Sequence, residues 1–233
     1  MQVDEGDGHG EALRRRGSRA RRESNAPHGR ALPTKSAASA PNPAGSHPVR
    51  DCNGRRRRRI AAAMSTGVPA VFLDRDGVLI EDTGYPHLEE HLRIMPGAIA
   101  AVGRLNRLGY LCVVVTNQSG VARGLFDEEQ MKAFNALMVR RFAAGGARLG
   151  AVYACPYHAE ARDERWRHPD HPDRKPNPGM ILRAIADHQI DPARSFLIGD
   201  QDSDLEAARR AGVPGFRFEG GDLDAFVREL LGH

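Results

Sequence analysis

An apolar run that stops at two closely spaced aspartates constrains the fold of this chain more than any other feature. Residues 70–73 (Ala-Val-Phe-Leu) are followed at once by Asp74-Arg-Asp76-Gly77. A short apolar run bounded by a turn signal is typical of a strand buried in a parallel sheet. Open α/β sheets build their binding sites at the carboxyl ends of their strands. The sequence therefore predicts a strand over 70–73 that presents Asp74 and Asp76 at such an edge.

Apolar runs with strand character alternate with helical patterns along residues 65–233. Strands that alternate with helices favour a parallel sheet covered by helices on both faces. We therefore predict an α/β, Rossmann-like three-layer sandwich, with a long polar loop over 155–177. The expected strands cover 70–73, 111–115, 149–154, 195–198 and 215–218, and the expected helices cover 96–108, 127–142, 178–188, 205–211 and 222–230.

Residues 1–64 differ in composition from the rest of the chain. They hold 14 Lys or Arg against 6 Asp or Glu and lack Phe, Tyr and Trp, whereas the other 169 residues hold 20 basic against 24 acidic ones. Such a segment buries too little apolar surface to offset its chain entropy. We expect a disordered basic extension over 1–64 and a folded domain over 65–233. Because the first strand begins near Ala70, we expect the native protein to start at or near Met64.

Two functional roles for residues 1–64 are alternatives to the interpretation that this extension has no function. The five consecutive arginines from Arg55 to Arg59 could tether the chain to nucleic acid or to another acidic surface. An organelle transit peptide would also be basic, but the acids Asp4, Glu5, Asp7 and Glu11 argue against one. We favour the simplest interpretation, a segment without function.

The bulk composition excludes several classes of protein. No apolar stretch reaches the roughly 18 residues that a membrane span needs. The widely separated Cys52, Cys112 and Cys155 suit a reducing cytoplasm rather than a disulfide framework. The folded part is mildly acidic and lacks a basic groove studded with aromatics, which disfavours nucleic acid as a partner. We expect a cytoplasmic monomer that binds neither membranes nor nucleic acid.

Four polar clusters follow predicted strands or lie on the long loop. Each cluster alone is weak, since Asp-Gly turns, helix caps and solvated lysines are common. At one sheet edge, however, they would combine a nucleophile, donors for phosphoryl oxygens, a counter-charge and carboxylates for a metal, which phosphoryl transfer requires. The clusters are Asp74 with Asp76, Thr116-Asn-Gln-Ser-Gly120, Arg174-Lys175, and Asp200-Gln-Asp-Ser-Asp204.

The order of these motifs resembles the haloacid-dehalogenase (HAD) superfamily of phosphohydrolases, type IIIA, over residues 69–220. The resemblance implies a HAD-like fold without a large cap domain and Mg²⁺-dependent hydrolysis of a small phosphorylated sugar. The segments Phe72–Gly77, Gly84-Tyr85, Val114–Gly124, Cys155-Pro156 and Arg174–Met180 look like the branch of the heptose-bisphosphate and histidinol-phosphate phosphatases.

Within this branch the expected reaction is removal of the 7-phosphate of D-glycero-D-manno-heptose 1,7-bisphosphate, a precursor in lipopolysaccharide synthesis. Hydrolysis of histidinol phosphate or another small ester is the first alternative. A nucleic-acid 3′-phosphatase and a non-enzymatic phosphate sensor are more remote ones. Arg123 and Arg174 favour a doubly phosphorylated substrate over these alternatives.

The resemblance implies a catalytic role for each aspartate. Asp74 would be the nucleophile that forms an aspartyl-phosphate. Asp76 would protonate the leaving sugar oxygen and then deprotonate the attacking water. Asp74, the backbone carbonyl of Asp76 and Asp200 would ligate Mg²⁺. One residue next to the expected metal ligand Asp200 departs from the pattern of the branch. Gln201 occupies a position where close relatives often have Lys.

The resemblance also implies which residues hold the substrate. Thr116 and Lys175 would complete the catalytic set, the first as a donor to the phosphoryl oxygens and the second as a counter-charge. Arg174 could bind a second phosphate through its planar guanidinium. A flap after the first strand and the 155–177 loop would enclose the sugar. The expected substrate-binding residues are Asp82, Thr83, Gly84, Tyr85, Thr116, Asn117, Gln118, Ser119, Arg174 and Lys175.

The 155–177 loop departs from the branch in its metal ligands. The branch usually holds a structural zinc there through Cys-x-His and Cys-x-Cys. The corresponding residues are Cys155, Tyr157, His171 and Asp173, so one expected cysteine remains. We expect a metal-free loop held by its prolines and its packing. An alternative zinc site would use Cys155, His158, His168 and His171.

Overall fold

The computed structural model of the chain describes residues 67–232. The extension expected over 1–64 and the start expected at Met64 lie outside the described residues. Within them a five-stranded sheet has the order β3-β2-β1-β4-β5, and every neighbouring pair is parallel. The strands are β1 (Ala70–Leu73), β2 (Leu111–Asn117), β3 (Ala151–Cys155), β4 (Phe196–Gly199) and β5 (Gly215–Arg217).

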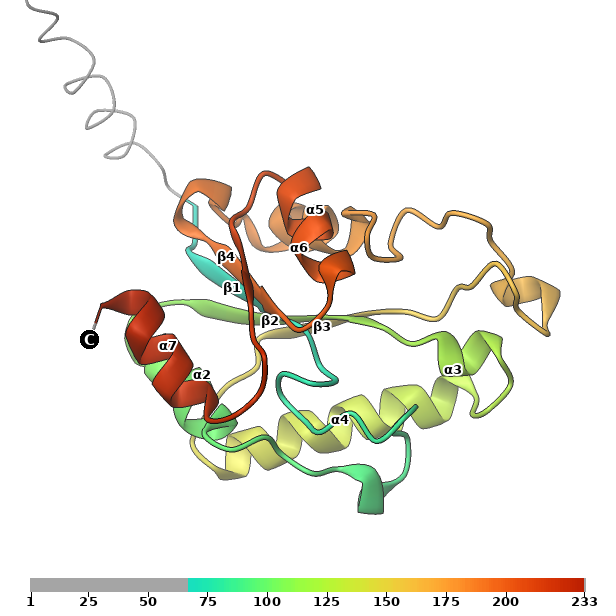
Figure 1. Ribbon diagram of the computed structural model, residues 1–233, viewed down its shortest axis with the longest axis horizontal. Helices are drawn as coiled ribbons and strands as arrows, with labels where there is room; N and C mark the ends of the chain where they lie inside the picture. Colours follow the sequence, from blue (N-terminus) through green and yellow to red (C-terminus); the bar gives the residue numbers. More distant parts are fainter. Residues whose placement is uncertain (1–66, 233) are drawn as a thin grey trace, which may run out of the picture. The chain divides into compact units, whose positions relative to one another are not determined.

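Helices cover both faces of this sheet (Figure 1). The α-helices are α2 (Ala98–Arg107), α3 (Ser119–Ala122), α4 (Glu128–Ala144), α5 (Gly179–His188), α6 (Asp202–Arg210) and α7 (Leu223–Leu231). Helices α2, α4 and α7 pack on the face that carries Val71, Leu73 and Val114. Helices α5 and α6 pack on the opposite face, which carries Phe72 and Val113. Successive side chains of a strand point to opposite faces, so both faces are apolar. The predicted three-layer α/β fold is confirmed.

Some boundaries differ from those predicted. Helix α6 begins at Asp202 rather than 205, because the Asp204 carboxylate accepts a hydrogen bond from the backbone N–H of Gln201 at 3.0 Å and caps the helix. Acids in the first helical turn interact favourably with the helix dipole. Strand β2 extends to Asn117, and β3 covers Ala151–Cys155 rather than 149–154. The predicted start of helix α6 was therefore three residues too late.

Several short elements lie in segments predicted to be irregular. Helix α3 follows β2 directly, and three 3₁₀ turns occur as η1 (Glu89–His91), η2 (Glu164–Trp166) and η3 (Pro192–Arg194). Helical elements of three or four residues span about one turn and cannot show a repeating hydrophobic pattern, so periodicity does not reveal them. In α3 a side chain on Gly120 would collide with the ring of Phe126. This close contact fixes where the chain turns after β2.

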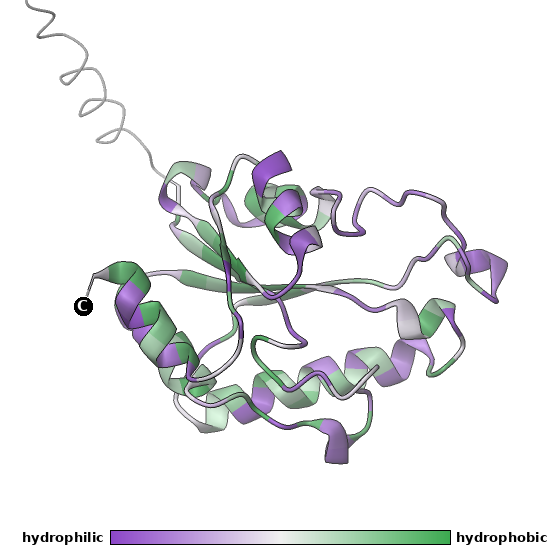
Figure 2. Ribbon diagram, viewed as in Figure 1, coloured by the Kyte–Doolittle hydropathy of each residue, from purple (hydrophilic) through white to green (hydrophobic). Residues whose placement is uncertain are grey.

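Hydropathy follows the layers of the fold. Figure 2 shows the strands as mainly apolar and the segment between β3 and α5 as mainly hydrophilic. The connections from β1 to α2 and from β3 to α5 are the long ones, and both leave the carboxyl ends of strands. A site at this edge would therefore be flanked by two extended segments, as in other open α/β sheets. None of the helices within residues 67–232 is long and apolar enough to cross a membrane.

Candidate active site

The turn after β1 brings three aspartates together. The backbone N–H of Asp74 still donates to the Ile198 carbonyl at 3.0 Å, so its carboxylate leaves the sheet beside the end of β4. Gly77 adopts φ 81°, and a Cβ there would lie 2.6 Å from Oδ2 of Asp200. Only glycine allows both this backbone conformation and this close approach. The predicted clustering of Asp74, Asp76 and Asp200 at one edge is therefore present.

A group of carboxylates at this edge has the spacing of a metal site. Ligand oxygens of Asp74, Asp200 and Asp204 all lie within 4.8 Å of one another, and no other His, Cys, Asp or Glu group of this kind occurs within residues 67–232. Oδ1 of Asp200 is buried without a hydrogen-bond partner. Buried carboxylate oxygens that lack a donor fit a hard cation such as Mg²⁺. The residues present therefore fit the expected metal, with Asp204 added to the predicted ligands.

One buried lysine neutralises this acidic group. The Lys175 ammonium lies 2.8 Å from Oδ1 of Asp74 and 2.5 Å from Oδ1 of Asp204, and it donates to the Val115 carbonyl at 2.8 Å. Its side chain is only 3% exposed. Burial opposes the charge, but Asp74 and Asp204 outweigh burial and raise the pKa of Lys175. The lysine is therefore a permanent cation in contact with the expected nucleophile.

Burial also changes the acidity of the expected nucleophile. Loss of solvent raises the pKa of the Asp74 carboxyl to about 7; Lys175 opposes this shift, whereas Asp204 and Asp76 add to it. The raised pKa stabilises the metal-free folded protein below the ordinary pKa of 3.8, and this contribution is lost as the pH rises to about 7. Near neutral pH a cation must therefore compete with a proton for Asp74.

We expect Mg²⁺ to bind this site more weakly in acid. Below the pKa of about 7, each pH unit should weaken the apparent affinity about tenfold, because a proton must leave Asp74 before the cation binds. Calorimetric titrations one unit below and one unit above that pKa, in two buffers of different ionisation enthalpy, measure both affinity and proton release. An affinity that is independent of pH, without proton release, would contradict this expectation.

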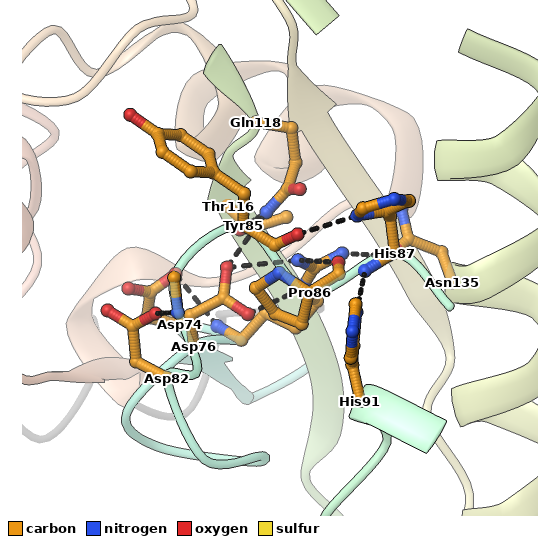
Figure 3. A network of polar contacts seen from close by, with 12 residues as sticks. Asp74, Asp76, Asp82, Tyr85, Pro86, His87, His91, Thr116, Gln118 and Asn135 are labelled. Atoms are coloured by element: carbon orange, nitrogen blue, oxygen red, sulfur yellow. Dashed lines mark hydrogen bonds and ion pairs between the residues drawn. The ribbon is translucent and has the colours of Figure 1, made fainter. Parts of the chain in front are cut away.

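The second aspartate of the turn is held by a network of side chains (Figure 3). The Arg75 guanidinium donates to both Asp76 oxygens, from Nε to Oδ1 at 3.0 Å and from Nη2 to Oδ2 at 3.0 Å. Nε2 of Gln118 donates to Oδ2 of Asp76 at 2.9 Å and to Oγ1 of Thr116 at 2.8 Å. These contacts fix the plane of the Asp76 carboxylate beside the hydroxyl expected to bind phosphate.

A cavity of about 380 Å³ joins these groups. A larger and more apolar cavity of about 670 Å³ lies between α4 and β3, but it contains neither of the turn aspartates. The smaller cavity combines the clustered carboxylates of Asp74, Asp200 and Asp204 with the buried Thr116 hydroxyl and the buried Lys175 ammonium, and it is therefore the candidate active site. Its lining residues are Asp74, Asp76, Asp82, Gly84, Tyr85, Thr116, Asn117, Gln118, Lys175, Asp200, Gln201, Ser203 and Asp204.

Three of the expected substrate-binding residues are not among the described residues that line this cavity, namely Thr83, Ser119 and Arg174. Nη1 of Arg174 donates to the Tyr157 carbonyl at 3.1 Å, within the long loop. The side chain of Asn117 lines the cavity, but its amide donates to the Lys175 carbonyl and accepts from the Lys175 N–H, both at 3.0 Å. Asn117 therefore fixes the position of Lys175, and its amide is already engaged.

The sequence-based selection omitted three residues that line this cavity, namely Gln201, Ser203 and Asp204. Asp204 is 1% exposed and contacts Lys175, although only Asp200 was named from its cluster. Its signal was an acid four residues after Asp200, one helical turn along α6. Gln201 also lines the cavity, and its Nε2 donates to Oδ2 of Asp200 at 2.7 Å. The Gln201 amide thus orients a candidate metal ligand.

No three of the four alternative zinc ligands in the long loop lie within 4.8 Å of one another, although Cys155 and His171 are neighbours. The Tyr157 ring stacks on His171 at 3.8 Å between centroids, and Cys155 Sγ lies 3.9 Å from Nδ1 of His171. Both ring nitrogens of His158 are engaged, with the Glu160 N–H at 3.0 Å and with Arg123 at 3.2 Å. Burial raises the pKa of Cys155 to about 11, which disfavours the thiolate that binds zinc. The Tyr157 ring therefore packs against one of the four alternative zinc ligands.

We expect the purified protein to carry no stoichiometric zinc, and the Tyr157–His171 stack to stabilise the loop instead. Tyr157→Ala should lower the unfolding free energy by about 0.5–1.5 kcal/mol, beyond the loss of buried area, as for other aromatic pairs. Elemental analysis after dialysis and urea unfolding with and without a zinc chelator test the two parts. One tightly held zinc per chain, together with chelator sensitivity, would contradict this interpretation.

Comparison with known proteins identifies the relatives of this chain. The profile of the HAD-hydrolase-like family matches residues 173–223, which include Lys175, Asp200 and Asp204. The D-glycero-beta-D-manno-heptose-1,7-bisphosphate 7-phosphatase of Rhodopseudomonas palustris is 48% identical over 164 residues, 70% of this chain and 90% of that protein. The enzyme of the same name from Vibrio cholerae is 45% identical over 145 residues, 62% of this chain and 77% of that protein.

Solved structures show the same relationship. A putative HAD-like phosphatase from Mesorhizobium loti superposes with a TM-score of 0.63 at 39% identity, covering 66% of this chain and 74% of that one. The D,D-heptose 1,7-bisphosphate phosphatase from B. bronchiseptica, solved with magnesium and phosphate, gives 0.61 at 30% identity and covers 70% and 98%. The chain therefore belongs to the HAD-like hydrolases, in the family of the D-glycero-D-manno-heptose-1,7-bisphosphate 7-phosphatases.

Proposed function

We propose that this chain is a Mg²⁺-dependent phosphomonoesterase that removes the 7-phosphate of D-glycero-D-manno-heptose 1,7-bisphosphate. The observation that carries the proposal is the contact of Asp74 with the buried Lys175 ammonium, inside a cavity that also holds Asp76 and Thr116. The names of the relatives support the substrate. An acidic cluster with one internal cation suits a reaction in which negative charge develops on a phosphoryl group.

The chemistry proceeds in two displacements. An oxygen of Asp74 attacks phosphorus, the bond from phosphorus to the sugar oxygen breaks, and Asp76 donates a proton to that oxygen. Asp76 then takes a proton from a water molecule, whose oxygen attacks phosphorus and releases inorganic phosphate and free Asp74. Each displacement is easier than direct attack of water on the ester. Asp76 thus acts once as general acid and once as general base.

The remaining site residues stabilise charge and position the ester. Asp74, Asp200 and Asp204, together with the backbone carbonyl of Asp76, would hold Mg²⁺, which when bound would offset repulsion between the attacking carboxylate and the phosphate. Thr116 is well placed to donate to a phosphoryl oxygen, and Lys175 balances the charge on the transferring group.

Groups suited to a sugar surround the rest of the cavity. Asp82 and Tyr85 from the flap and Ser203 from α6 line it and offer hydrogen bonds to hydroxyl groups. A second phosphate would need a cation near the long loop. Arg174 lies there, and Nε of Arg123 is buried without a hydrogen-bond partner. These features favour a sugar with two phosphates over an ester with one.

Parallel kinetics with Mg²⁺ on three esters test the proposal. The esters are heptose 1,7-bisphosphate, the same sugar with the 7-phosphate alone, and histidinol phosphate. We expect the highest kcat/KM for the bisphosphate, because the second phosphate supplies extra binding energy to the transition state. A preference for histidinol phosphate would reject the substrate but keep the reaction class. Hydrolysis of none of them would reject the reaction.

A further inference from the structure

We propose that Arg75 is a positioning residue that holds the Asp76 carboxylate in the orientation needed for proton transfer. The inference rests on the proposed role of Asp76 as general acid and base. Arg75 lies between the two aspartates in sequence, yet it is not among the described residues that line the cavity. Its side chain is fully buried. It would therefore act on the reaction only through the residue that it holds.

The contacts of Arg75 are those of a rigid support. Its guanidinium binds both oxygens of Asp76, and Nη1 donates to Oδ1 of Asn135 at 2.8 Å. Nη2 donates to the Pro86 carbonyl at 3.2 Å (Figure 3). The guanidinium carbon lies 5.0 Å from the centre of the Phe134 ring. These bonds use four of the five N–H groups of a guanidinium. An arginine with this many fixed partners has little freedom to reorient.

The supports come from two separate parts of the fold. Asn135 and Phe134 belong to α4, the long helix under the sheet, whereas Pro86 belongs to the segment between β1 and α2. That segment is itself anchored, because the His87 ring stacks on Phe126 at 4.6 Å and Nδ1 of His87 lies 2.8 Å from the Tyr85 carbonyl. Arg75 therefore connects the acid to both the helical scaffold and the flap.

This geometry matters because proton transfer depends on orientation. A displacement of about 1 Å at a reacting group can cost about 10²-fold in rate. An aspartate held by Gln118 alone would retain one hydrogen bond to Oδ2 and could rotate about its Cβ–Cγ bond. Lysine cannot restore this fork, the pair of hydrogen bonds to both oxygens of Asp76, because its donors lie on one nitrogen rather than on a planar group. Arg75→Lys should therefore keep a cation while freeing the carboxylate.

The test compares two esters that differ in their need for an acid. An alkyl phosphate requires protonation of its leaving oxygen, whereas p-nitrophenyl phosphate releases a stable phenolate without it. In Arg75→Lys we expect turnover of the alkyl sugar phosphate to fall about 10²-fold. With p-nitrophenyl phosphate we expect a rapid burst of phenolate, stoichiometric with the protein, followed by slow turnover, because water attack still needs Asp76. If Arg75 had only a structural role, the substitution would lower the rate of the first displacement by the same factor for both esters.

A matched pair elsewhere in the protein provides the control. Arg104 forms the same fork with Asp224, at 2.7 and 3.0 Å, where α2 meets α7. Arg104→Lys should leave unchanged the ratio of the first-step rates on the two esters. Asn135→Ala removes one support without touching Asp76, and it should skew the ratio in the same direction by a smaller factor. It replaces Arg75→Lys as the test if that variant does not fold.

The outcomes separate this inference from the proposed function. The positioning role of Arg75 is supported if the Arg75 or Asn135 variant shows a phenolate burst and a first-step rate that falls more for the sugar phosphate than for p-nitrophenyl phosphate. An unchanged ratio in a folded variant overturns it while the wild-type protein remains a phosphatase. Wild-type protein that hydrolyses neither ester would instead remove the proposed function, and the inference with it.

Discussion

Asp74→Asn is expected to abolish phosphate release while leaving the protein folded. The amide has the shape of the carboxylate, but it is a far weaker nucleophile and carries no charge for the metal. Removal of a covalent nucleophile costs about 10⁴–10⁶-fold in kcat in other hydrolases. Stability should be kept, because the substitution removes one of the acids around Lys175 and the burial that raises the pKa of Asp74 already opposes its charge.

A matched control separates chemistry from general loss of charge. Asp202 is in the first turn of α6, and its side chain is 97% exposed. Asp202→Asn makes the same chemical change near the site, without altering the cavity lining, and should retain activity. Phosphate release under Mg²⁺ and thermal unfolding of both variants are the measurements. Undiminished turnover in folded Asp74→Asn would reject the aspartyl-phosphate mechanism.

Lys175→Met is expected to cost both stability and activity. The substitution keeps the length of the side chain but leaves Asp74 and Asp204 buried without their cation. Breaking a buried ion pair from one side costs about 3–5 kcal/mol. Without the lysine, which opposes the rise in the pKa of Asp74, the Asp74 carboxyl would hold its proton more tightly in the folded state, so the deficit should grow as the pH rises through neutrality. Mg²⁺ should recover part of the lost stability by replacing the missing charge.

Urea unfolding across pH, with and without Mg²⁺, measures this effect. Lys132→Met is the control, because Lys132 forms an exposed ion pair with Glu128 at 2.6 Å on the surface of α4. Exposed pairs of this kind contribute about 0.3–0.5 kcal/mol. Equal losses in the two variants would show that the buried ammonium does not balance the acidic cluster.

Much of the fold, and the placement of its polar clusters, could be predicted from local sequence patterns. The apolar run at 70–73 and the Asp-Gly turn after it predict a strand and its end, and similar runs predict the rest of the sheet. Because parallel strands present their carboxyl ends at one edge, the order of the polar clusters also placed Asp74, Thr116, Lys175 and Asp200 near one another. Helix α3 and the three 3₁₀ turns offered no comparable signal.

The partners of individual side chains were not predictable in this way. Arg75 in the sequence is a polar residue in a turn, and its burial beneath α4 depends on Asn135, 60 positions away. Asn117 was expected to bind phosphate, but it clamps the backbone of Lys175, 58 positions away. Arg174 was expected at the substrate, but in the structure it bonds to its own loop.

The sequence by itself determined the α/β sheet, the edge that carries the site and the kinds of groups that gather there. Periodicity and turn chemistry act over a few residues, so one chain is enough to detect them. Only the tertiary structure decided that Asp204 joins the metal-competent acids, that Lys175 contacts Asp204 as well as Asp74, and that Arg75 holds Asp76. Long polar side chains choose partners by packing between elements far apart in the sequence, and burial then makes every unpaired donor or charge costly.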